Sequence, residues 1–334
     1  MHDGKREGSG EVEVRELRVP GEAAGERLDA WLAHRLGVGR RTIRRALEEG
    51  RVRLDAGAAR KGLRLRGGER IRWLGPLPAR DFEPLPSEGL AERLRILHRD
   101  AWLLAVDKPA GVPCHPLRAD EPETILGAVR LLDPEAATAG PRRAEGGLLH
   151  RLDTETSGVL LFARSPEAFA RLAPLVRGGE ATKRYRAVTV GAPSTPSVLR
   201  FPLAAHPSDP SRVVACAPYG PAERWRGRPV PCESRLLEAE PHGPWALLTA
   251  ELRQGWRHQL RVHLAAAGHP IVGDAHYGGP RPPGLERHLL HAEAVRLPHP
   301  EGRPPWKLHA PLPPDFAHWL AVGPGGTEEQ GETP

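Results

Sequence analysis

The residues best suited to chemistry lie in the stretch HRLDTETSG, residues 150–158, directly before the apolar run VLLFA. Its first carboxylate, Asp153, stands among hydroxyl residues and two positions after Arg151. An acid at the entry to a buried strand costs free energy unless it is solvated, paired or used. With hydrogen-bond donors around it, such an acid stays ionised and can serve as a nucleophile or a base. The residues alone leave two interpretations open, a catalytic aspartate and an aspartate that caps a turn.

Glu155 follows Asp153 two positions later and offers a second carboxylate. Two carboxylates that flank a scissile bond are the machinery of glycoside hydrolases. Residues two apart face the same side of an extended strand, but a turn does not guarantee that geometry. A glycoside-type hydrolase is therefore an open alternative, and it predicts that replacing Glu155 abolishes activity.

Two further stretches carry candidate groups. KRYRAV places Tyr185 between basic residues on an alternating strand, where its ring can stack on a flipped base and its hydroxyl can contact an acid. A tyrosine half-buried in the core fits the same pattern. RHQLRVHLAAAG, residues 257–268, is predicted to form a helix with Arg261 three positions after His258. Arg261 can then project beside His258 or pair with an ionised acid in a cleft.

Lys108 precedes Pro-Ala-Gly at the end of an apolar run. We expect a tight turn with the lysine charge at the edge of a cleft, and a catalytic amine is the second interpretation. The 16 histidines and three cysteines do not form a metal-binding pattern, because HQLRVH departs from the zinc spacing HExxH and no CxxC pair occurs. The odd number of cysteines also argues against a disulfide framework. We therefore expect no metal site.

The composition points to a basic protein that contacts phosphate groups. The chain has 334 residues, a net charge of +6 and 48 basic residues, of which only five are lysines. Guanidinium groups bind phosphate in a bidentate fork, although a GC-rich genome would also enrich arginine. No apolar run reaches the length of a membrane span, and the first residues lack the apolar core of a secretory signal. We expect a cytoplasmic protein without a membrane partner.

Residues 22–74 are predicted to form a small α/β module. Leu28, Trp31, Leu32 and Leu36 follow helical spacing, a second helix ends at Gly50, and short alternating strands follow. Four arginines within six residues favour a phosphate-binding surface over an ordinary solvated helix face. These are Arg40, Arg41, Arg44 and Arg45.

Residues 94–322 are predicted to form the larger unit. Strands such as WLLAVDKP, GVLLFAR and WALLTAEL outnumber the helices and are mostly adjacent in sequence, which predicts an α+β fold with a largely antiparallel, mixed sheet. The stretch SPEAFARLAPLVRGG is predicted to be a helix capped by Ser165. The Pro-rich residues 75–93 are predicted to be a linker, and residues 1–21 and 323–334 polar tails.

Several stretches, taken in order, resemble the RluA-type pseudouridine synthases. LLAVDKPAGVPCHP is similar to the first motif of that family, HRLDTETSG matches its second motif completely, and HQLRVHLAAAGHPIVGD is similar to its third. KRYRAV matches the short strand that bears the family's tyrosine, and RHLLHAEAVRLPHP is similar to its C-terminal motif. Residues 26–74 resemble the RNA-binding domain named after ribosomal protein S-four, an arrangement known in this family.

The resemblance implies roles for individual residues. It makes Asp153 the catalytic aspartate, Tyr185 the active-site tyrosine and Arg261 the arginine that pairs with the aspartate, while Leu260 lines the base pocket. It also suggests contacts between the RNA and a set of polar residues near these motifs. These are Arg151, His258, Gln259 and Lys108, with Arg40, Arg41, Arg44 and Arg45 of the smaller unit.

The resemblance further implies that the protein isomerises uridine in RNA to pseudouridine without a cofactor or a metal. We expect large-subunit (23S) ribosomal RNA as the substrate and transfer RNA as the alternative, and a monomer with no obligatory protein partner. One departure stands out, because the family's third motif usually begins Thr-Gly-Arg and this chain has Gln254 and Trp256 at the Thr and Arg positions. A non-catalytic RNA-binding protein that has kept the fold is therefore a second alternative.

Overall fold

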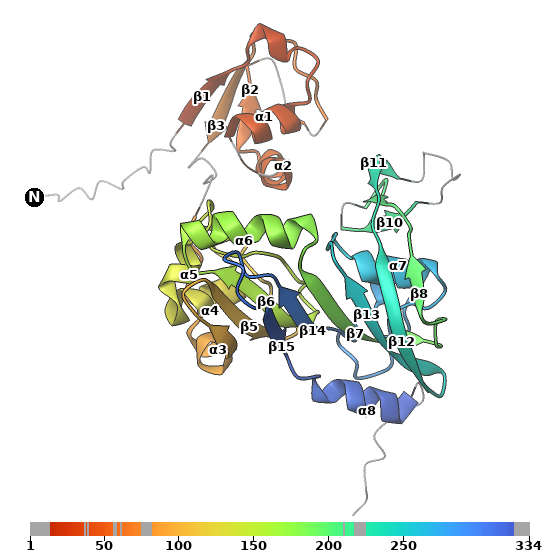
Figure 1. Cartoon of the computed structure of the whole chain (residues 1–334). Coiled ribbons are helices and arrows are strands. Elements are labelled where there is room, and N and C mark those ends of the chain that lie inside the picture. Colours follow the sequence, from red (N-terminus) through yellow and green to blue (C-terminus); the bar gives the residue numbers. More distant parts are fainter. Residues whose placement is uncertain are drawn as a thin grey trace, which may run out of the picture. The chain divides into compact units, whose positions relative to one another are not determined.

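The computed structural model describes residues 14–36, 38, 40–55, 59–60, 62–74, 82–209, 211–216 and 225–323. The chain divides into two compact units, Met1–Phe82 and Glu83–Pro334 (Figure 1). Of the expected tails and linker, residues 1–13, 75–81 and 324–334 lie outside the described residues. No helix in the described ranges has the length and apolar character needed to cross a bilayer.

Unit 1 is a small α/β module with one hydrophobic core. Leu28, Leu32, Ile43, Ile71 and Trp73 are completely buried in it. Its three strands form an antiparallel sheet in the order β1-β3-β2. The elements are β1 (Val14–Arg18), the 3-10 turn η1 (Gly21–Ala23), α1 (Leu28–Leu36), α2 (Arg40–Glu48), β2 (Val52–Leu54) and β3 (Arg70–Leu74).

Two sequence expectations about the tail and the linker need correction. Residues 14–18, expected in the N-terminal tail, form β1, because Leu17 faces the module core and the strand pairs with β3. Residues 88–93, expected in the linker, form helix α3 (Glu88–Arg93), whose Leu90 is buried in the core of unit 2. Both segments are short and of mixed polarity, so the sequence pattern predicts irregular chain, whereas strand pairing in β1 and the buried Leu90 in α3 hold them in place.

Unit 2 is built on a nine-stranded sheet in the order β4-β5-β6-β14-β7-β13-β12-β8, with β15 paired to β14. Every pair is antiparallel except β6 with β14, so the expected largely antiparallel, mixed sheet is confirmed. The strands are β4 (Arg95–Arg99), β5 (Leu103–Lys108), β6 (Ser157–Ala163), β7 (Thr182–Val190), β8 (Ser197–Leu199), β12 (Ser234–His242), β13 (Trp245–Leu252), β14 (Leu290–Leu297) and β15 (Trp306–His309). A second small sheet contains β9 (Leu203–Ala205), β10 (Val213–Ala215) and β11 (Arg226–Val230).

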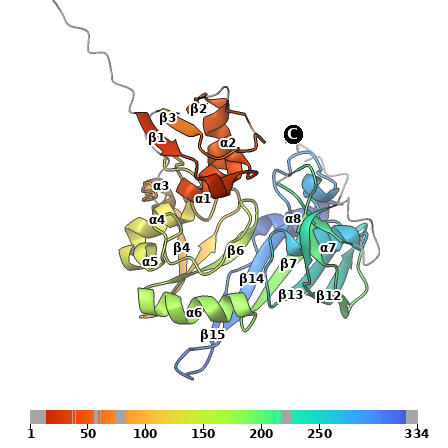
Figure 2. The ribbon, with the colours of Figure 1, turned by 90° about the horizontal axis from the view of Figure 1, so that it is seen from above.

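Helices flank the large sheet on both faces (Figure 1, Figure 2). Alternation along β6 sends Phe162 into a core shared with α4 and α7, and sends Leu161 into a core shared with α6 and β15. Helix α6 begins after Ser165, whose hydroxyl accepts a hydrogen bond from the Ala168 amide, as the sequence predicted. The helices are α4 (Ile125–Leu132), α5 (Pro134–Thr138), α6 (Pro166–Gly178), α7 (Gln259–Ala266), the 3-10 turn η3 (Ala275–Tyr277) and α8 (Pro314–Val322).

The parallel pairing of β6 with β14 depends on a glycine. Gly158 has φ of +114°, and a Cβ atom there would lie 2.2 Å from the carbonyl oxygen of Ala292 on β14. Only glycine permits both this backbone conformation and this close approach. The start of β6, and with it the turn that precedes the strand, is thereby held against the middle of the sheet.

Candidate active site

Asp153 lies in the turn that enters β6. The turn closes through a hydrogen bond from the Thr156 amide to the carbonyl oxygen of Asp153, 3.0 Å long. From one side, the ammonium of Lys108 donates to the carbonyl oxygens of Pro109 (2.9 Å) and Thr154 (2.8 Å). From the other side, the Thr156 hydroxyl shares a 2.8 Å hydrogen bond with Nε2 of His288. Two neighbouring segments therefore fix the backbone that carries the carboxylate.

Arg261 on α7 joins Asp153 to a second carboxylate. One terminal nitrogen of its guanidinium donates to Oδ2 of Asp153 at 2.7 Å. The other donors, Nε and the second terminal nitrogen, bind both oxygens of Asp274 at 2.7 and 2.8 Å. The side chain of Asp274 is 1% exposed and that of Asp153 is 26% exposed. The bidentate pair with Asp274 orients the guanidinium, and Asp153 stays open to the outside on one side.

The surroundings keep Asp153 ionised. Burial by itself raises the pKa of this carboxyl group, but the charges of His258 and Arg261 and the hydrogen bond from Arg261 outweigh burial and bring the pKa below its ordinary value. Burial lowers the pKa of His258 to about 4, so this imidazole is neutral at pH 7. Arg261 therefore supplies the positive charge that stabilises the Asp153 carboxylate at neutral pH.

Tyr185 on β7 lies beside this ion pair. Its side chain is almost completely buried, and burial together with the charge of Asp153 raises the pKa of its hydroxyl group. The phenol therefore stays protonated and can donate a hydrogen bond. Leu260, buried at the first turn of α7, belongs to the same hydrophobic cluster as Tyr185. The sequence-predicted group of Asp153, Tyr185, Leu260 and Arg261 is thus brought together in one place.

His258 differs from its expected position on a helix. It precedes α7 as the N-cap residue with φ of +56°, a conformation in which its ring turns back toward the turn before β6. Its Nδ1 shares a 2.6 Å hydrogen bond with the hydroxyl of Tyr277, and its Nε2 lies 3.7 Å from Oδ1 of Asp153. The helical spacing correctly predicted that His258 lies near Arg261. His258 reaches Asp153, however, from the turn before the helix and not from the helix itself.

Two residues expected to contact RNA are used inside the protein. Lys108 is fully buried, so the expectation of a charge at the edge of a cleft is wrong, and its ammonium shapes the Asp153 turn. Gln259 is 3% exposed. Its side-chain oxygen accepts a hydrogen bond from the backbone amide of Trp256, and its side-chain nitrogen donates to the carbonyl oxygen of Glu233. Arg151, in contrast, is exposed and forms no ion pair within the described part of the chain.

Glu155 does not form a carboxylate pair with Asp153. Its carboxylate accepts a hydrogen bond from the backbone amide of His288 at 3.1 Å, and Nδ1 of the same histidine lies 3.1 Å from the same carboxylate oxygen. The interaction with the His288 side chain is the main reason why the pKa of Glu155 falls to about 2. The geometry gives Glu155 a structural partner of its own, which removes the basis for the glycoside hydrolase alternative.

The arginines of the smaller unit are only partly free for a ligand. Arg40 is exposed at the start of α2. Arg44 donates to the completely buried Asp29 at 3.4 Å, and Arg45 donates to Glu49 at 2.5 Å. The side chain of Arg41 lies outside the described residues. Two of the expected phosphate ligands thus have carboxylate partners within the unit.

Sequence reasoning missed three residues that the fold brings close to the candidate site. The sequence pattern assigns no role to Asp274, Tyr277 or Lys183. Asp274 follows Arg261 by 13 residues, so no helical or strand periodicity links them. The one feature of the sequence that could indicate this contact is an Asp in the loop that follows the helix bearing Arg261.

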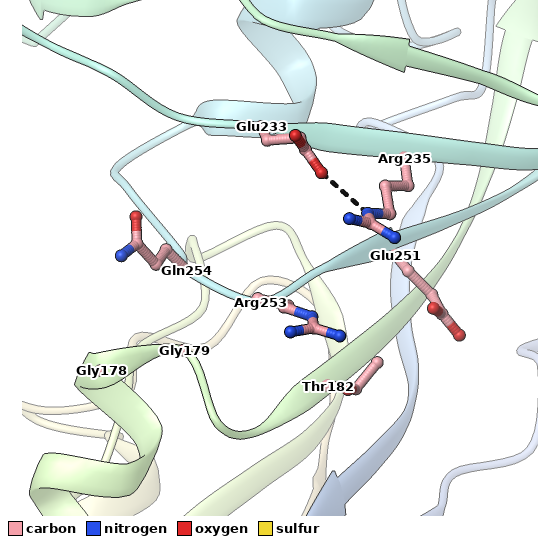
Figure 3. Close-up of a pocket in the computed structure, with 8 residues that line it drawn as sticks. All are labelled: Gly178, Gly179, Thr182, Glu233, Arg235, Glu251, Arg253 and Gln254. Carbon is pink, nitrogen blue, oxygen red and sulfur yellow. Dashed lines mark hydrogen bonds and ion pairs between the residues drawn. The ribbon is translucent and has the colours of Figure 1, made fainter.

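A cavity of about 290 Å³ lies on the reverse face of the β7–β13 pair (Figure 3). Glu251, one of its lining residues, pairs with Arg184, whereas the adjacent Ala250 pairs with Tyr185. Strand alternation therefore places this cavity on the opposite face from Tyr185. Its charges are largely paired, as in the 2.8 Å hydrogen bond from Arg235 to Glu233 drawn in Figure 3. The cavity is separate from the Asp153 site.

Comparisons with known proteins match this arrangement. A family model described as RNA pseudouridylate synthase matches residues 102–266. A protein of Chloroflexus aurantiacus named as an uncharacterized RNA pseudouridine synthase is 33% identical over 318 residues, covering 92% of this chain and 95% of that protein. The chain belongs to the RNA pseudouridine synthase family. It is therefore an enzyme of the kind that isomerises uridine in RNA to pseudouridine.

Other RNA pseudouridine synthases support this assignment. The protein of Xanthomonas campestris named ribosomal large subunit pseudouridine synthase D is 33% identical over 326 residues, with 92% of each chain covered. The solved structure of human RNA pseudouridylate synthase domain containing 4 aligns with a TM-score of 0.53 and 26% identity over 70% of this chain and 94% of that chain. Within the described ranges of this synthase, no cluster of three or more His, Cys, Asp or Glu residues has metal-binding geometry.

The Glu155–His288 pair predicts a pH-dependent difference in stability. Because the pKa of Glu155 is about 2 in the folded protein and 4.5 ordinarily, the pair stabilises the fold above about pH 4.5. This contribution is lost as the pH falls toward 2. Glu155→Ala should therefore have a lower Tm than the wild type at pH 7, and the difference should shrink between pH 4.5 and the acid limit of folding. A difference that grows on acidification would contradict the assigned partner.

Proposed function

We propose that this enzyme modifies uridine in large-subunit ribosomal RNA and that Asp153 is its catalytic residue. The observation that carries the proposal is the 2.7 Å ion pair between Arg261 and Asp153, which presents an ionised, partly exposed carboxylate. The relatives of Xanthomonas campestris and Nitrosomonas europaea, 33% and 32% identical, are both named ribosomal large subunit pseudouridine synthase D. Each is matched over more than four fifths of its own length.

In the proposed reaction the target uridine leaves its stack and enters the site. Unstacking costs about a few kcal/mol, which contacts with an aromatic ring and the pocket offset. Asp153 then acts as the nucleophile or the base while the N-glycosidic bond breaks. Tyr185, protonated and beside Asp153, holds the base, and Leu260 provides an apolar wall. The uracil turns within the site, and its C5 atom bonds to the same ribose carbon as Asp153 either leaves that carbon or returns the proton it removed. The C5 proton is then released and N1 takes up a proton.

We further propose that unit 1 is an S-four-type RNA-binding domain and that residues 94–322 carry catalysis. The two helices on a three-stranded sheet and the exposed Arg40 support this assignment. Arg151, exposed two residues before Asp153, is proposed to contact the RNA next to the target. In this proposal the protein works as a cytoplasmic monomer without an obligatory protein partner.

The non-catalytic alternative rested on Gln254 and Trp256. Within the described ranges, neither side chain forms a hydrogen bond with Asp153, Tyr185 or Arg261. The side chain of Trp256 is 46% exposed, which suits contact with an RNA base more than a role in the catalytic group. We therefore attribute to these two positions an effect on the choice of RNA and not on the reaction.

Tritium release tests the proposed function. Transcripts of large-subunit ribosomal RNA labelled with tritium at C5 of uridine should release tritium with the wild type, because pseudouridine formation displaces the C5 hydrogen. Asp153→Asn should reduce the rate by about 10³-fold or more. The matched control Glu155→Ala should stay within about fivefold, since that carboxylate is bonded to His288. Release by Asp153→Asn at the wild-type rate would refute the catalytic assignment, and release only from transfer RNA would refute the substrate.

The salt dependence of binding tests the role of unit 1. Each phosphate contact releases counterions, so the logarithm of RNA affinity should fall linearly with the logarithm of salt concentration. In the full-length chain, Arg40→Gln should reduce the slope by about one. Arg303→Gln, an exposed arginine that pairs with Glu301 at 3.0 Å in unit 2, serves as the control and should leave the slope unchanged. Equal slopes for the wild type and Arg40→Gln would argue against this surface.

A further inference from the structure

Lys183 on β7 has a largely buried side chain, and its ammonium has no acceptor within the described residues. Its side chain is 4% exposed, yet within the described part of the chain it forms no hydrogen bond and no ion pair. Burial lowers the pKa of this ammonium to about 8, which leaves it mostly charged at pH 7. Nζ of Lys183 does not belong to the enclosed polar atoms that lack a partner in the described residues, so the ammonium is reachable from outside. An ammonium that is reachable and has no acceptor within the described residues can bind a group that arrives with a ligand.

Lys183 faces the same side of the sheet as Tyr185. The two residues are two positions apart on β7, and their partners on β13 are Leu252 and Ala250. The loop after β13 passes over the lysine, since a Cβ atom on Gly255 would lie 3.5 Å from Nζ. This loop continues directly into His258, which lies beside Asp153. The ammonium therefore lies between β7 and the loop that leads to His258.

His150 contributes a second unpartnered nitrogen at the same place. Its Nε2 is buried without a hydrogen-bond partner. Burial and then the nearby charge of Lys183 lower the pKa of this imidazole to about 3, so His150 is neutral at pH 7. Asp153 follows His150 by three residues and Tyr185 follows Lys183 by two. One short segment thus carries His150 and Asp153, and another carries Lys183 and Tyr185.

Lys108 shows what a structural buried lysine looks like in this protein. It is completely buried, and its pKa is likewise lowered to about 8 by burial, but its ammonium donates to two backbone carbonyl oxygens. Lys183, 4% exposed, has a similarly lowered pKa but lacks such acceptors within the described residues. The difference between the two lysines points to an acceptor outside the protein for Lys183.

We propose that Lys183 is a further catalytic residue, which holds a carbonyl oxygen of the flipped uracil as the glycosidic bond breaks. The inference rests on the proposed function. When the bond between N1 and C1′ breaks, its electron pair stays on the uracil and spreads to the ring carbonyl oxygens. A fixed ammonium stabilises that charge. The charge is consumed when C5 bonds to C1′, after which the C5 proton leaves and N1 takes up a proton.

The test compares Lys183→Met with Lys108→Met in the full-length enzyme. The substrate is a mixture of large-subunit ribosomal RNA and transfer RNA transcripts, tritiated at C5 of uridine, with the enzyme in excess so that one turnover is observed. Lys183→Met should slow the single-turnover rate by about 10²–10³-fold, with the Kd for RNA within about threefold of the wild type. Lys183→Gln, which keeps a neutral donor, should recover part of the rate.

Thermal unfolding separates catalysis from structure. Because the Lys183 ammonium has no acceptor within the described residues, Lys183→Met removes no internal hydrogen bond and its Tm should be no lower than that of the wild type. Lys108→Met removes the donor of two hydrogen bonds to backbone carbonyl oxygens and should therefore have a lower Tm. A lower Tm for Lys183→Met, or a rate within threefold of the wild type, would overturn the proposal. A weaker Kd with an unchanged rate would assign Lys183 to a phosphate and also overturn it. A wild type that releases no tritium contradicts the proposed function itself, and the inference falls with it.

Discussion

The site depends on one arginine held between two carboxylates. Asp274, almost completely buried, fixes the guanidinium of Arg261 through two hydrogen bonds, and the remaining donor reaches Asp153. Burial alone would favour protonation of Asp153, so without this neighbour the carboxylate would lose its charge near neutral pH more readily. The pair also sets the direction in which the carboxylate points. The carboxylate that we propose to be catalytic is thereby ionised and oriented before RNA arrives, which is the condition for electrostatic catalysis.

Buried polar side chains hold the backbone around this ion pair in place. Lys108 bonds the carbonyl oxygen of Thr154, and Thr156 bonds His288, so the Asp153 turn is fixed from two directions. Gly158 then lets β6 approach β14 closely enough to anchor the turn to the middle of the sheet. Each of these polar groups has its partner within the protein. The Lys183 ammonium has no acceptor within the described residues, and for that reason we connect it with the substrate.

Sequence reasoning reached the fold class and the centre of the site, but not its supports. Ser165 and its helix followed from local capping rules, because the cap and the helix are neighbours in the chain. The meeting of Asp153 with Arg261 followed from ordered motifs. The role of Asp274 did not, since its contact with Arg261 is set by a loop that no periodicity describes. Lys108 was placed at a surface because charge suggests exposure, whereas its carbonyl partners become apparent only in three dimensions.

The pKa of the Asp153 carboxyl group, followed by carbon-13 NMR in the wild type and in Arg261→Gln, tests the central claim most directly. Both folded proteins are titrated, with Glu155→Ala included to assign the neighbouring carboxylate. We expect a wild-type pKa below the ordinary value of 3.8 and a higher pKa in Arg261→Gln, because His258 alone then opposes the effect of burial. An Asp153 pKa that is the same in both proteins would contradict the claim that Arg261 keeps the catalytic carboxylate ionised.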